Sequence, residues 1–276
     1  MLLKALISAK WLYHNLSNPN LVILDASSAS RVDGGAFNFI DDTIPDARRL
    51  DLKTTFSDTA SPFPNTIPPP AEFEMACREL GINRDSIIIV FDNNGIYSSP
   101  RAWWLFKVMG HKNIAVLDGG LPHWVNMGFP TTKKHLEDFE RGNFKVGYDE
   151  NLVMDFKTVN YNIHNRSFVL VDARSAGRFN GTAAEPRQHI RSGHIPQSVN
   201  IPYTAVLHNG RYKGKKELYA IFNNACPGAR DLVFSCGSGV TACIIMLACK
   251  IGYAHSLKLY DGSWTEWATL NNLKAL

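Results

Sequence analysis

Short apolar runs alternate with amphipathic stretches along the whole chain. Leu21–Asp25 and Ser86–Asp92 in the first half, and Phe168–Asp172 and Asp231–Cys236 in the second, are rich in Val, Ile, Leu and Phe and end at an aspartate or a cysteine. Such runs are typical of buried strands. Residues 71–80 and 216–223 instead have helical spacing. This alternation predicts an α/β fold, with a mostly parallel sheet covered by helices on both faces.

The two halves of the chain carry the same features in the same order. Each has a strand ending in Asp-Ala, an Ile-Pro step, a second apolar run, a helix expected to end with glycine in the C′ position, and a closing Asp-Gly-x4-Trp. The paired residues are Asp25 and Asp172, Pro45 and Pro196, Gly110 and Gly252, and Asp118 and Asp261. Their near-constant offset predicts a tandem duplication: a domain over residues 1–130, a linker over 131–150 and a second domain over 151–276.

Composition and charge exclude several classes of protein. With 276 residues, 45% of them hydrophobic and 20% charged, the chain fits a soluble protein with a core rather than a disordered chain, a collagen or a coiled coil. Its net charge of +4 is not gathered into a run of like charges, so nucleic acid is not an expected partner. The longest apolar run, Ala242–Cys249, is too short to span a bilayer.

The five cysteines and the N-terminal sequence suggest a cellular compartment. The cysteines are odd in number and lack Cys-x-x-Cys spacing, so neither a disulfide framework nor a zinc site is expected. No secretory signal pattern precedes the first domain. We therefore expect a cytoplasmic protein without a metal.

The copies differ most at the end of their second apolar run. The first copy has Asp92 there, and the second has Cys236-Gly-Ser-Gly-Val-Thr241. Ligands of open α/β sheets bind at the carboxyl ends of strands. Gly237 and Gly239 allow successive N–H groups to turn inward, and a following helix adds its positive N-terminus. Both effects favour a thiolate, so Cys236 is the candidate nucleophile rather than a buried cysteine at a tight turn.

The residues around Cys236 limit the reactions that this cysteine is expected to catalyse. A phosphatase of the His-Cys-x5-Arg type is excluded, because Ser235 precedes the cysteine and Ala242 stands where the arginine belongs. A cysteine protease needs a histidine base that no spacing identifies. A persulfide on Cys236 fits better, because backbone N–H groups of residues 237–241 could hold its terminal sulfur anion without metal or cofactor. Cys243 and Cys249 follow at helical spacing and are expected in the core.

Together, Asp-Ala-Arg-Ser, Gly-His-Ile-Pro, the strand-end cysteine loop and Asp-Gly-Ser-Trp resemble the rhodanese (sulfurtransferase) family over about residues 5 to 270. The resemblance implies two tandem rhodanese-like domains, of which only the second is catalytic. The neutral loop Gly237, Ser238, Gly239, Val240 and Thr241 is similar to that of members using 3-mercaptopyruvate, whereas thiosulfate-using members carry charged or bulky residues there. The implied reaction moves sulfur from 3-mercaptopyruvate through Cys236 to a thiol or cyanide acceptor, and pyruvate leaves.

The resemblance also implies roles for individual side chains. Arg178 and Arg187 would hold the substrate carboxylate, as planar guanidinium forks can; the alternative for each is an ion pair with Glu185 or Asp172. Ser238 would assist proton transfer, or serve only as a turn residue.

Other positions are expected to be structural or depart from the family pattern. Arg174 and His194 are expected to have structural roles. The histidine that family members often carry before the first Ile-Pro is Thr43 here, so a Cys–Ser–His relay is not carried over.

Two alternatives remain open. A thiosulfate:cyanide sulfurtransferase would differ only in its donor. A non-catalytic persulfide carrier or regulatory rhodanese module would be expected to lack the cysteine in both copies, and only the first copy lacks it. The expected partners are a small anionic sulfur donor and a thiol acceptor such as a thioredoxin-like protein, with neither nucleic acid nor membrane.

Overall fold

The computed structural model describes residues 3–28, 42–228, 231–253 and 258–274. The chain forms two compact units that meet in sequence between Asp149 and Glu150, so segment 131–149 belongs to the first unit. Two short segments depart from this division. Ala60–Thr66 belongs to the second unit, and Asn209–Tyr212 to the first.

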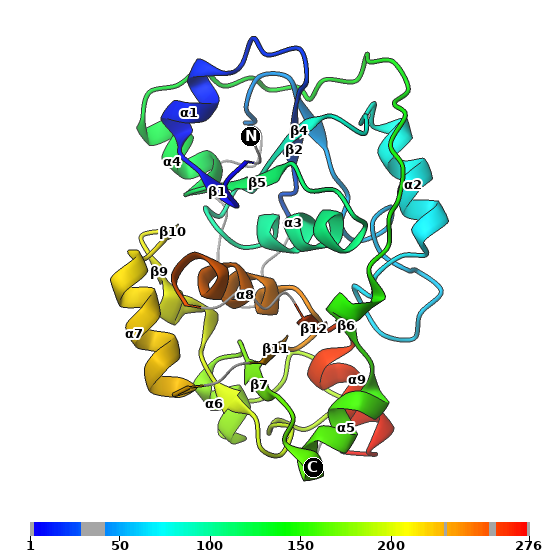
Figure 1. Ribbon diagram of the computed structural model, residues 1–276, viewed down its shortest axis with the longest axis vertical. Helices are drawn as coiled ribbons and strands as arrows, with labels where there is room; N and C mark the ends of the chain where they lie inside the picture. Colours follow the sequence, from blue (N-terminus) through cyan, green and yellow to red (C-terminus); the bar gives the residue numbers. More distant parts are fainter. Residues whose placement is uncertain (1–2, 29–41, 229–230, 254–257, 275–276) are drawn as a thin grey trace. The chain divides into compact units, whose positions relative to one another are not determined.

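The first unit is a five-stranded sheet with helices on both faces (Figure 1). The strand order is β1-β5-β4-β2-β3, and every pairing is parallel. Its strands are β1 (Leu6–Ile7), β2 (Leu21–Asp25), β3 (Ala47–Arg49), β4 (Ile87–Phe91) and β5 (Ile114–Leu117). Its helices are α1 (Ala9–His14), α2 (Pro70–Glu79), α3 (Ser99–Val108) and α4 (Gly120–Asn126).

The second unit repeats this arrangement. Its sheet has the order β6-β12-β11-β7-β8, again with parallel pairings, so each strand has a counterpart in the first unit. Its strands are β6 (Val153–Met154), β7 (Val169–Asp172), β8 (Val199–Asn200), β11 (Leu232–Ser235) and β12 (Lys258–Tyr260). Its helices are α5 (Phe156–Asn165), α6 (Ala176–Asn180), α7 (Lys215–Ala225), α8 (Thr241–Gly252) and α9 (Ser263–Leu270).

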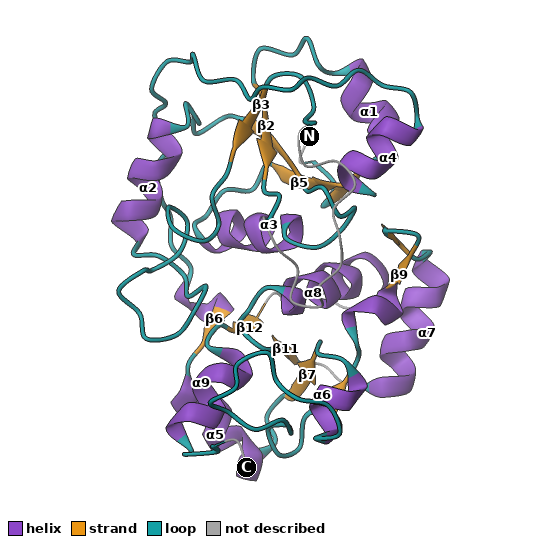
Figure 2. Cartoon of the chain, turned by 180° about the vertical axis from the view of Figure 1, so that it is seen from behind, coloured by secondary structure: helices purple, strands orange, loops and turns teal. Residues whose placement is uncertain are grey.

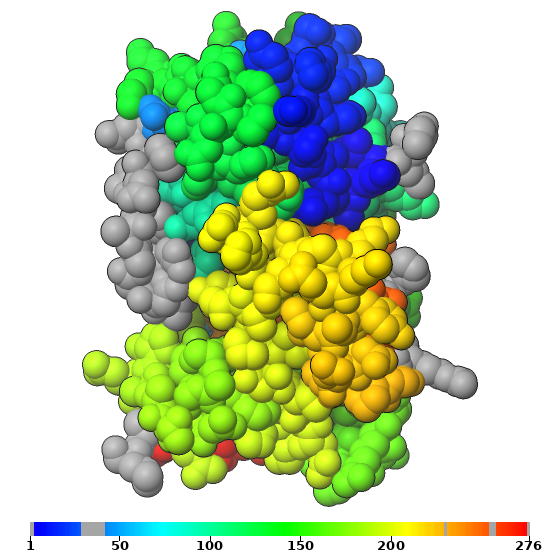
Figure 3. All heavy atoms as spheres, turned by 90° about the vertical axis from the view of Figure 1, so that its left-hand side faces the viewer, coloured from blue at the N-terminus to red at the C-terminus, as the bar shows by residue number. Residues whose placement is uncertain are grey.

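Smaller elements complete the chain. Two 3-10 turns, Glu150–Leu152 and Tyr203–Val206, and the short strands β9 (Leu207–His208) and β10 (Arg211–Tyr212) lie between the main elements. Figure 2 shows helices in purple beside the orange strands of each unit, and α7, drawn in yellow to orange, lies on the surface of its unit in Figure 3. Within the described ranges, no helix is long and apolar enough to cross a membrane.

Successive side chains of a strand point to opposite faces of the first sheet. Because the strands are apolar at successive positions, both faces are apolar and both are covered by helices. Ile89 and Phe91 pack with Leu12 of α1 and Trp124 of α4. A cluster of aromatic rings from α2, α3 and two neighbouring loops forms a second apolar group: Phe56, Phe73, Phe106 and Phe144. The predicted α/β class, the duplication and the two-sided covering by helices are thus confirmed.

The two glycines expected to end helices have different roles. Gly110 follows α3 with φ of +87°, as a C′ glycine does. Gly252 is instead the last residue of α8, and Tyr253 is the C-cap, so the C′ prediction for Gly252 is wrong. A Cβ at Gly252 would lie 2.5 Å from Cβ of Leu218. Glycine is needed there because α7 packs closely against α8.

Candidate active site

Cys236 lies where the sequence pattern predicts, at the carboxyl end of a central strand. It directly follows β11, which pairs with β7 and β12, and α8 begins five residues later. Ser235 is in register with Asp172, so the ends of β11 and β7 lie side by side. Cys236 is only 2% exposed. The loop between Cys236 and Val240 therefore joins a buried strand to the N-terminus of a 12-residue helix.

The start of α9 holds this loop through backbone and hydroxyl groups. Ser263 Oγ accepts hydrogen bonds from the N–H groups of Cys236 and Gly239, both at 3.2 Å. Trp264 N donates to Cys236 O (3.0 Å). Thr265 donates to the carbonyl of Gly237 from both N (3.1 Å) and Oγ1 (2.5 Å). The closing Asp-Gly-Ser-Trp of the second copy thus fixes the cysteine loop, a purpose that the sequence pattern alone did not reveal.

Four amides of this loop have no internal partner. The N–H of Gly239 already donates to Ser263 Oγ. The N–H groups of Gly237, Ser238, Val240 and Thr241 donate to no other group in the described part of the chain. Unpaired N–H groups at the N-terminus of a helix form an anion-binding site, which the helix dipole strengthens.

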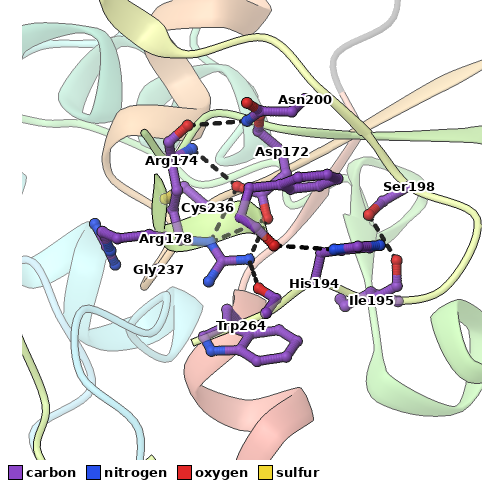
Figure 4. Close-up of polar contacts among 12 residues, drawn as sticks. Asp172, Arg174, Arg178, His194, Ile195, Ser198, Asn200, Cys236, Gly237 and Trp264 are labelled. Carbon is purple, nitrogen blue, oxygen red and sulfur yellow. Dashed lines mark hydrogen bonds and ion pairs between the residues drawn. The ribbon is translucent and has the colours of Figure 1, made fainter. Parts of the chain in front are cut away.

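Two guanidinium groups lie beside the residue that follows the cysteine. A Cβ added to Gly237 would lie 2.8 Å from Arg178 Nη2 and 3.8 Å from Arg187 Nη1. Both candidate arginines thus lie next to the cysteine loop, and Figure 4 shows Arg178 together with Cys236 and Gly237.

The two arginines differ in their own partners. Arg178 forms an ion pair with Glu185, with Nη2 2.6 Å from Oε2 and Nε 3.2 Å from Oε1. Arg187 has no ion-pair partner among the described residues. Burial lowers the pKa of Arg187, and the charge of Arg178 lowers it further, while negative charge on Cys236 and Glu185 opposes the shift. The half-buried, unpaired Arg187 is therefore the stronger candidate for binding an anion.

Glu185 is shared between Arg178 and a fully buried arginine, Arg174. Arg174 Nη1 lies 2.7 Å from Glu185 Oε1, and its Nη2 lies 2.6 Å from Asp172 Oδ2. Its guanidinium also stacks over the Trp264 ring at 4.6 Å (Figure 4). Burial alone would lower the pKa of Arg174, but the two carboxylates outweigh it and raise the pKa. This network fixes the orientation of Arg178.

Ser238 has a partner that the sequence did not suggest. Asn65 Nδ2 donates to Ser238 Oγ at 2.9 Å, although the residues are 173 positions apart. Asn65 belongs to segment 60–66 of the second unit and has φ of +60°. An asparagine in a proline-rich stretch is a turn signal, but no local pattern connects it with the cysteine loop. Thr43 instead donates to Asp25 Oδ2 in the first unit (3.3 Å).

In the first unit, an aspartate side chain fills the equivalent loop. Asp92 follows β4 as Cys236 follows β11, and its Oδ2 accepts from the backbone N–H groups of Tyr97 (2.9 Å), Ser98 (3.1 Å) and Ser99 (2.9 Å). The Ser99 hydroxyl donates to the same oxygen at 2.6 Å. This copy therefore has neither a thiol nor free amides at these three positions.

The remaining candidates are packed into the second unit. The His194 ring stacks on Phe179 with centroids 4.1 Å apart, and Nδ1 lies 2.9 Å from Phe179 O. Cys243 and Cys249 on α8 are fully buried. Among the described residues, no three His, Cys, Asp or Glu side chains gather closely enough to hold a metal ion.

Comparisons with known proteins agree with this geometry. The family model for the rhodanese-like domain matches twice, over residues 8–127 and 156–270. The chain is 35% identical over 271 residues to the 3-mercaptopyruvate sulfurtransferase of Escherichia coli K12, covering 97% of this chain and 96% of that protein. It is also 35% identical to the thiosulfate sulfurtransferase of Rattus norvegicus, covering 97% and 93%.

A solved structure is similar to this chain over nearly its whole length. The crystal structure of the 3-mercaptopyruvate sulfotransferase SseA from Escherichia coli superposes with a TM-score of 0.81 and 33% identity, covering 95% of this chain and 99% of that one. The duplicated fold, the two domain matches and the full-length similarity lead to one conclusion. The chain belongs to the rhodanese family and is a two-domain sulfurtransferase.

Proposed function

We propose that this sulfurtransferase moves sulfur from 3-mercaptopyruvate, through a persulfide on Cys236, to a thiol or cyanide acceptor, and releases pyruvate. One observation carries the proposal: Cys236 begins a loop with four open amides, and Arg178 and Arg187 lie beside Gly237 of that loop. The amides suit a sulfur anion on the cysteine, and the guanidinium groups suit the carboxylate of the donor.

Overall sequence identity does not distinguish 3-mercaptopyruvate from thiosulfate as the donor. The choice of donor therefore depends on the loop sequence. Relatives named for 3-mercaptopyruvate and for thiosulfate are both 35% identical to this chain. The loop residues 237–241 carry no charge. A doubly charged thiosulfate would be held better by cationic loop side chains, whereas a monocarboxylate donor needs its cation where the carboxylate binds. Arg187, which has no ion-pair partner in the described ranges, supplies that cation.

In the first half-reaction, the Cys236 thiolate attacks the sulfur of 3-mercaptopyruvate. A sulfur–sulfur bond forms, the carbon–sulfur bond breaks, and its electron pair generates the enolate of pyruvate. The proton from the substrate thiol ends on the enolate carbon, so the products are pyruvate and an ionised persulfide. The amides of Gly237, Ser238, Val240 and Thr241 hold that anion.

Ser238 is the group that we propose to assist the proton transfer. Asn65 donates to its oxygen, so the hydroxyl keeps its own hydrogen to donate to the substrate. An asparagine amide does not exchange protons near neutral pH, so this pair orients the hydroxyl without acting as a base.

In the second half-reaction, an acceptor attacks the outer sulfur of the persulfide. The sulfur–sulfur bond breaks and the Cys236 thiolate leaves. Cyanide becomes thiocyanate, and a thiolate acceptor becomes a persulfide. A reduced thioredoxin-like protein is the kind of dithiol partner that we propose as the acceptor in the cell.

Steady-state kinetics with both donors, using cyanide as the common acceptor, tests the proposal. We expect kcat/KM for 3-mercaptopyruvate to exceed that for thiosulfate at least about tenfold, which corresponds to roughly 1.4 kcal/mol in the transition state. Preference for thiosulfate would overturn the donor assignment. Turnover by Cys236→Ser would overturn the persulfide mechanism. Uptake of one sulfur without repeated turnover would identify a carrier instead.

A further inference from the structure

The hydroxyl of Ser263 is saturated with hydrogen bonds inside the second unit. Its oxygen accepts from the N–H of Cys236 and the N–H of Gly239, each at 3.2 Å, and its hydrogen goes to the carbonyl of Tyr260 at 2.9 Å. A serine hydroxyl has one donor and two acceptor positions, so all three are occupied. Because Ser263 is fully buried, no water replaces these partners without rearrangement.

Ser263 holds this hydroxyl in place from a backbone conformation that favours glycine. Its φ is +54°, in the left-handed region where a Cβ meets the adjacent carbonyl. The equivalent position of the first copy, two residues after the motif aspartate, is Gly120 with φ of +50°. The residues that follow these two positions make matching hydrogen bonds. Leu121 N donates to Asp92 O at 3.0 Å, and Trp264 N donates to Cys236 O at 3.0 Å.

The first copy gives an independent reason for its glycine. A Cβ on Gly120 would lie 2.3 Å from the carbonyl oxygen of Asp92. In the second copy the loop leaves room for a side chain at this position. The residue there is a serine, although its φ is unfavourable for any residue with a Cβ. Strained backbone conformations persist where surrounding contacts hold them in place, often at functional sites. Here the two hydrogen bonds to the cysteine loop hold Ser263 in its unfavourable conformation.

We infer that Ser263 is a positioning residue for sulfur transfer, which ties residues 236 and 239 together and so fixes the amides that hold the sulfur anion. The inference rests on the proposed function, in that Cys236 is taken as the nucleophile. Since Cys236 N–H and Gly239 N–H are the ones bound to Ser263, the amides of Gly237 and Ser238 lie between two fixed points of the loop. Ser263 does not act on the substrate, because its hydrogen is already donated to Tyr260.

The inference predicts that activity and stability respond differently to substitution. Ser263→Ala removes the hydroxyl and keeps the unfavourable φ, whereas Ser263→Gly removes the hydroxyl and relieves the strain. We expect both variants to lose at least about tenfold in kcat, with KM for 3-mercaptopyruvate within about twofold of wild type, because Arg178 and Arg187 are untouched. Ser263→Gly should melt at a higher temperature than Ser263→Ala.

Thr269→Val is the matched control. It deletes a hydroxyl from the same helix, but that hydroxyl donates to the carbonyl of Thr265 and not to the cysteine loop. We expect its kcat to stay within about threefold of wild type.

The experiment measures kcat, KM and melting temperature for the three variants, together with sulfur uptake from 3-mercaptopyruvate by mass spectrometry. Wild-type kcat in Ser263→Gly would overturn the inference, as would an equal loss in Thr269→Val. Ser263→Gly copies the residue of the first unit at this φ, so it remains informative if Ser263→Ala does not fold. Cys236→Ser is tested in parallel. Sulfur uptake by that variant overturns the proposed function, whereas its inactivity beside fully active Ser263 variants overturns only this inference.

Discussion

Replacing Asp92 should destabilise the first unit more than any change at its surface. The carboxylate is fully buried, and its Oδ2 accepts from three backbone N–H groups and the Ser99 hydroxyl, while Oδ1 accepts from Asn94 N at 3.0 Å. Asp92→Ala leaves five donors without this acceptor. Stranding a buried donor costs about 1–3 kcal/mol. Since Ser99 can rotate and Asn94 is partly exposed, the three buried amides dominate, which gives about 4–6 kcal/mol.

Asp92→Asn should have a smaller effect. Its amide oxygen can face the four donors of the Oδ2 side, but its NH2 group then faces the N–H of Asn94, and the four retained hydrogen bonds lose their charge. We expect a loss of about 2–3 kcal/mol. Urea unfolding gives the total, and hydrogen–deuterium exchange of the peptide containing β4 assigns the loss to the first unit.

Asp85 provides the control for these measurements. It lies on the surface of the same unit and has no hydrogen bond within the described ranges, so Asp85→Asn should change the free energy of unfolding by less than about 0.5 kcal/mol. If Asp92→Ala and Asp85→Asn had the same stability, the carboxylate would not be what holds the loop of the first unit. The first unit would then offer no example of a negative group held by the amides of this loop.

Three further predictions concern the ion pairs and the cysteine loop. Arg174→Leu should cost about 3–5 kcal/mol in urea unfolding, because it leaves the buried carboxylate of Glu185 with one cation instead of two. Gly237→Ala should raise KM for 3-mercaptopyruvate about tenfold and lower the melting temperature less than Arg174→Leu does, since its Cβ would shift the Arg178 guanidinium but leave the arginine present; an unchanged KM would contradict the placement of that guanidinium. Burial alone raises the pKa of Asp25, but hydrogen bonds and a nearby arginine outweigh it and lower the pKa from 3.8. The stability that Asp25 contributes is therefore present above pH 3.8 and lost as the pH falls through the lower folded value, so Asp25→Asn should be less stable than wild type at pH 7 and approach it in acid.

Much of the fold was predictable because the central strands are buried on both faces. The strands β2, β4, β7 and β11 are apolar except for a polar last residue in three of them, and the structure places each within a residue or two of its expected bounds. The outer strands are different. β1, β6 and β8 have only two residues each, too few for any period, and they exist because a neighbouring strand pairs with them.

The candidate site was predictable only where contiguous residues form it. Cys236 follows from a strand, two glycines and a helix that are contiguous in the chain. The contact between Asn65 and Ser238 joins residues 173 positions apart, and no local pattern encodes it. Ser263 was visible as part of a repeated motif, but its function depends on where β11 and β12 bring the two loops together.

The two copies use the same loop in opposite ways. In the first unit the carboxylate of Asp92 occupies the amides of its own loop, and Gly120 gives no hydroxyl to it. In the second unit the thiol of Cys236 leaves four amides without a partner in the described part of the chain, and Ser263 ties the loop from behind. Unpaired amides destabilise a fold, so the second unit carries a local penalty that the first unit avoids. An anion bound at Cys236 removes that penalty, so donor analogues should stabilise the second unit and leave the first unchanged.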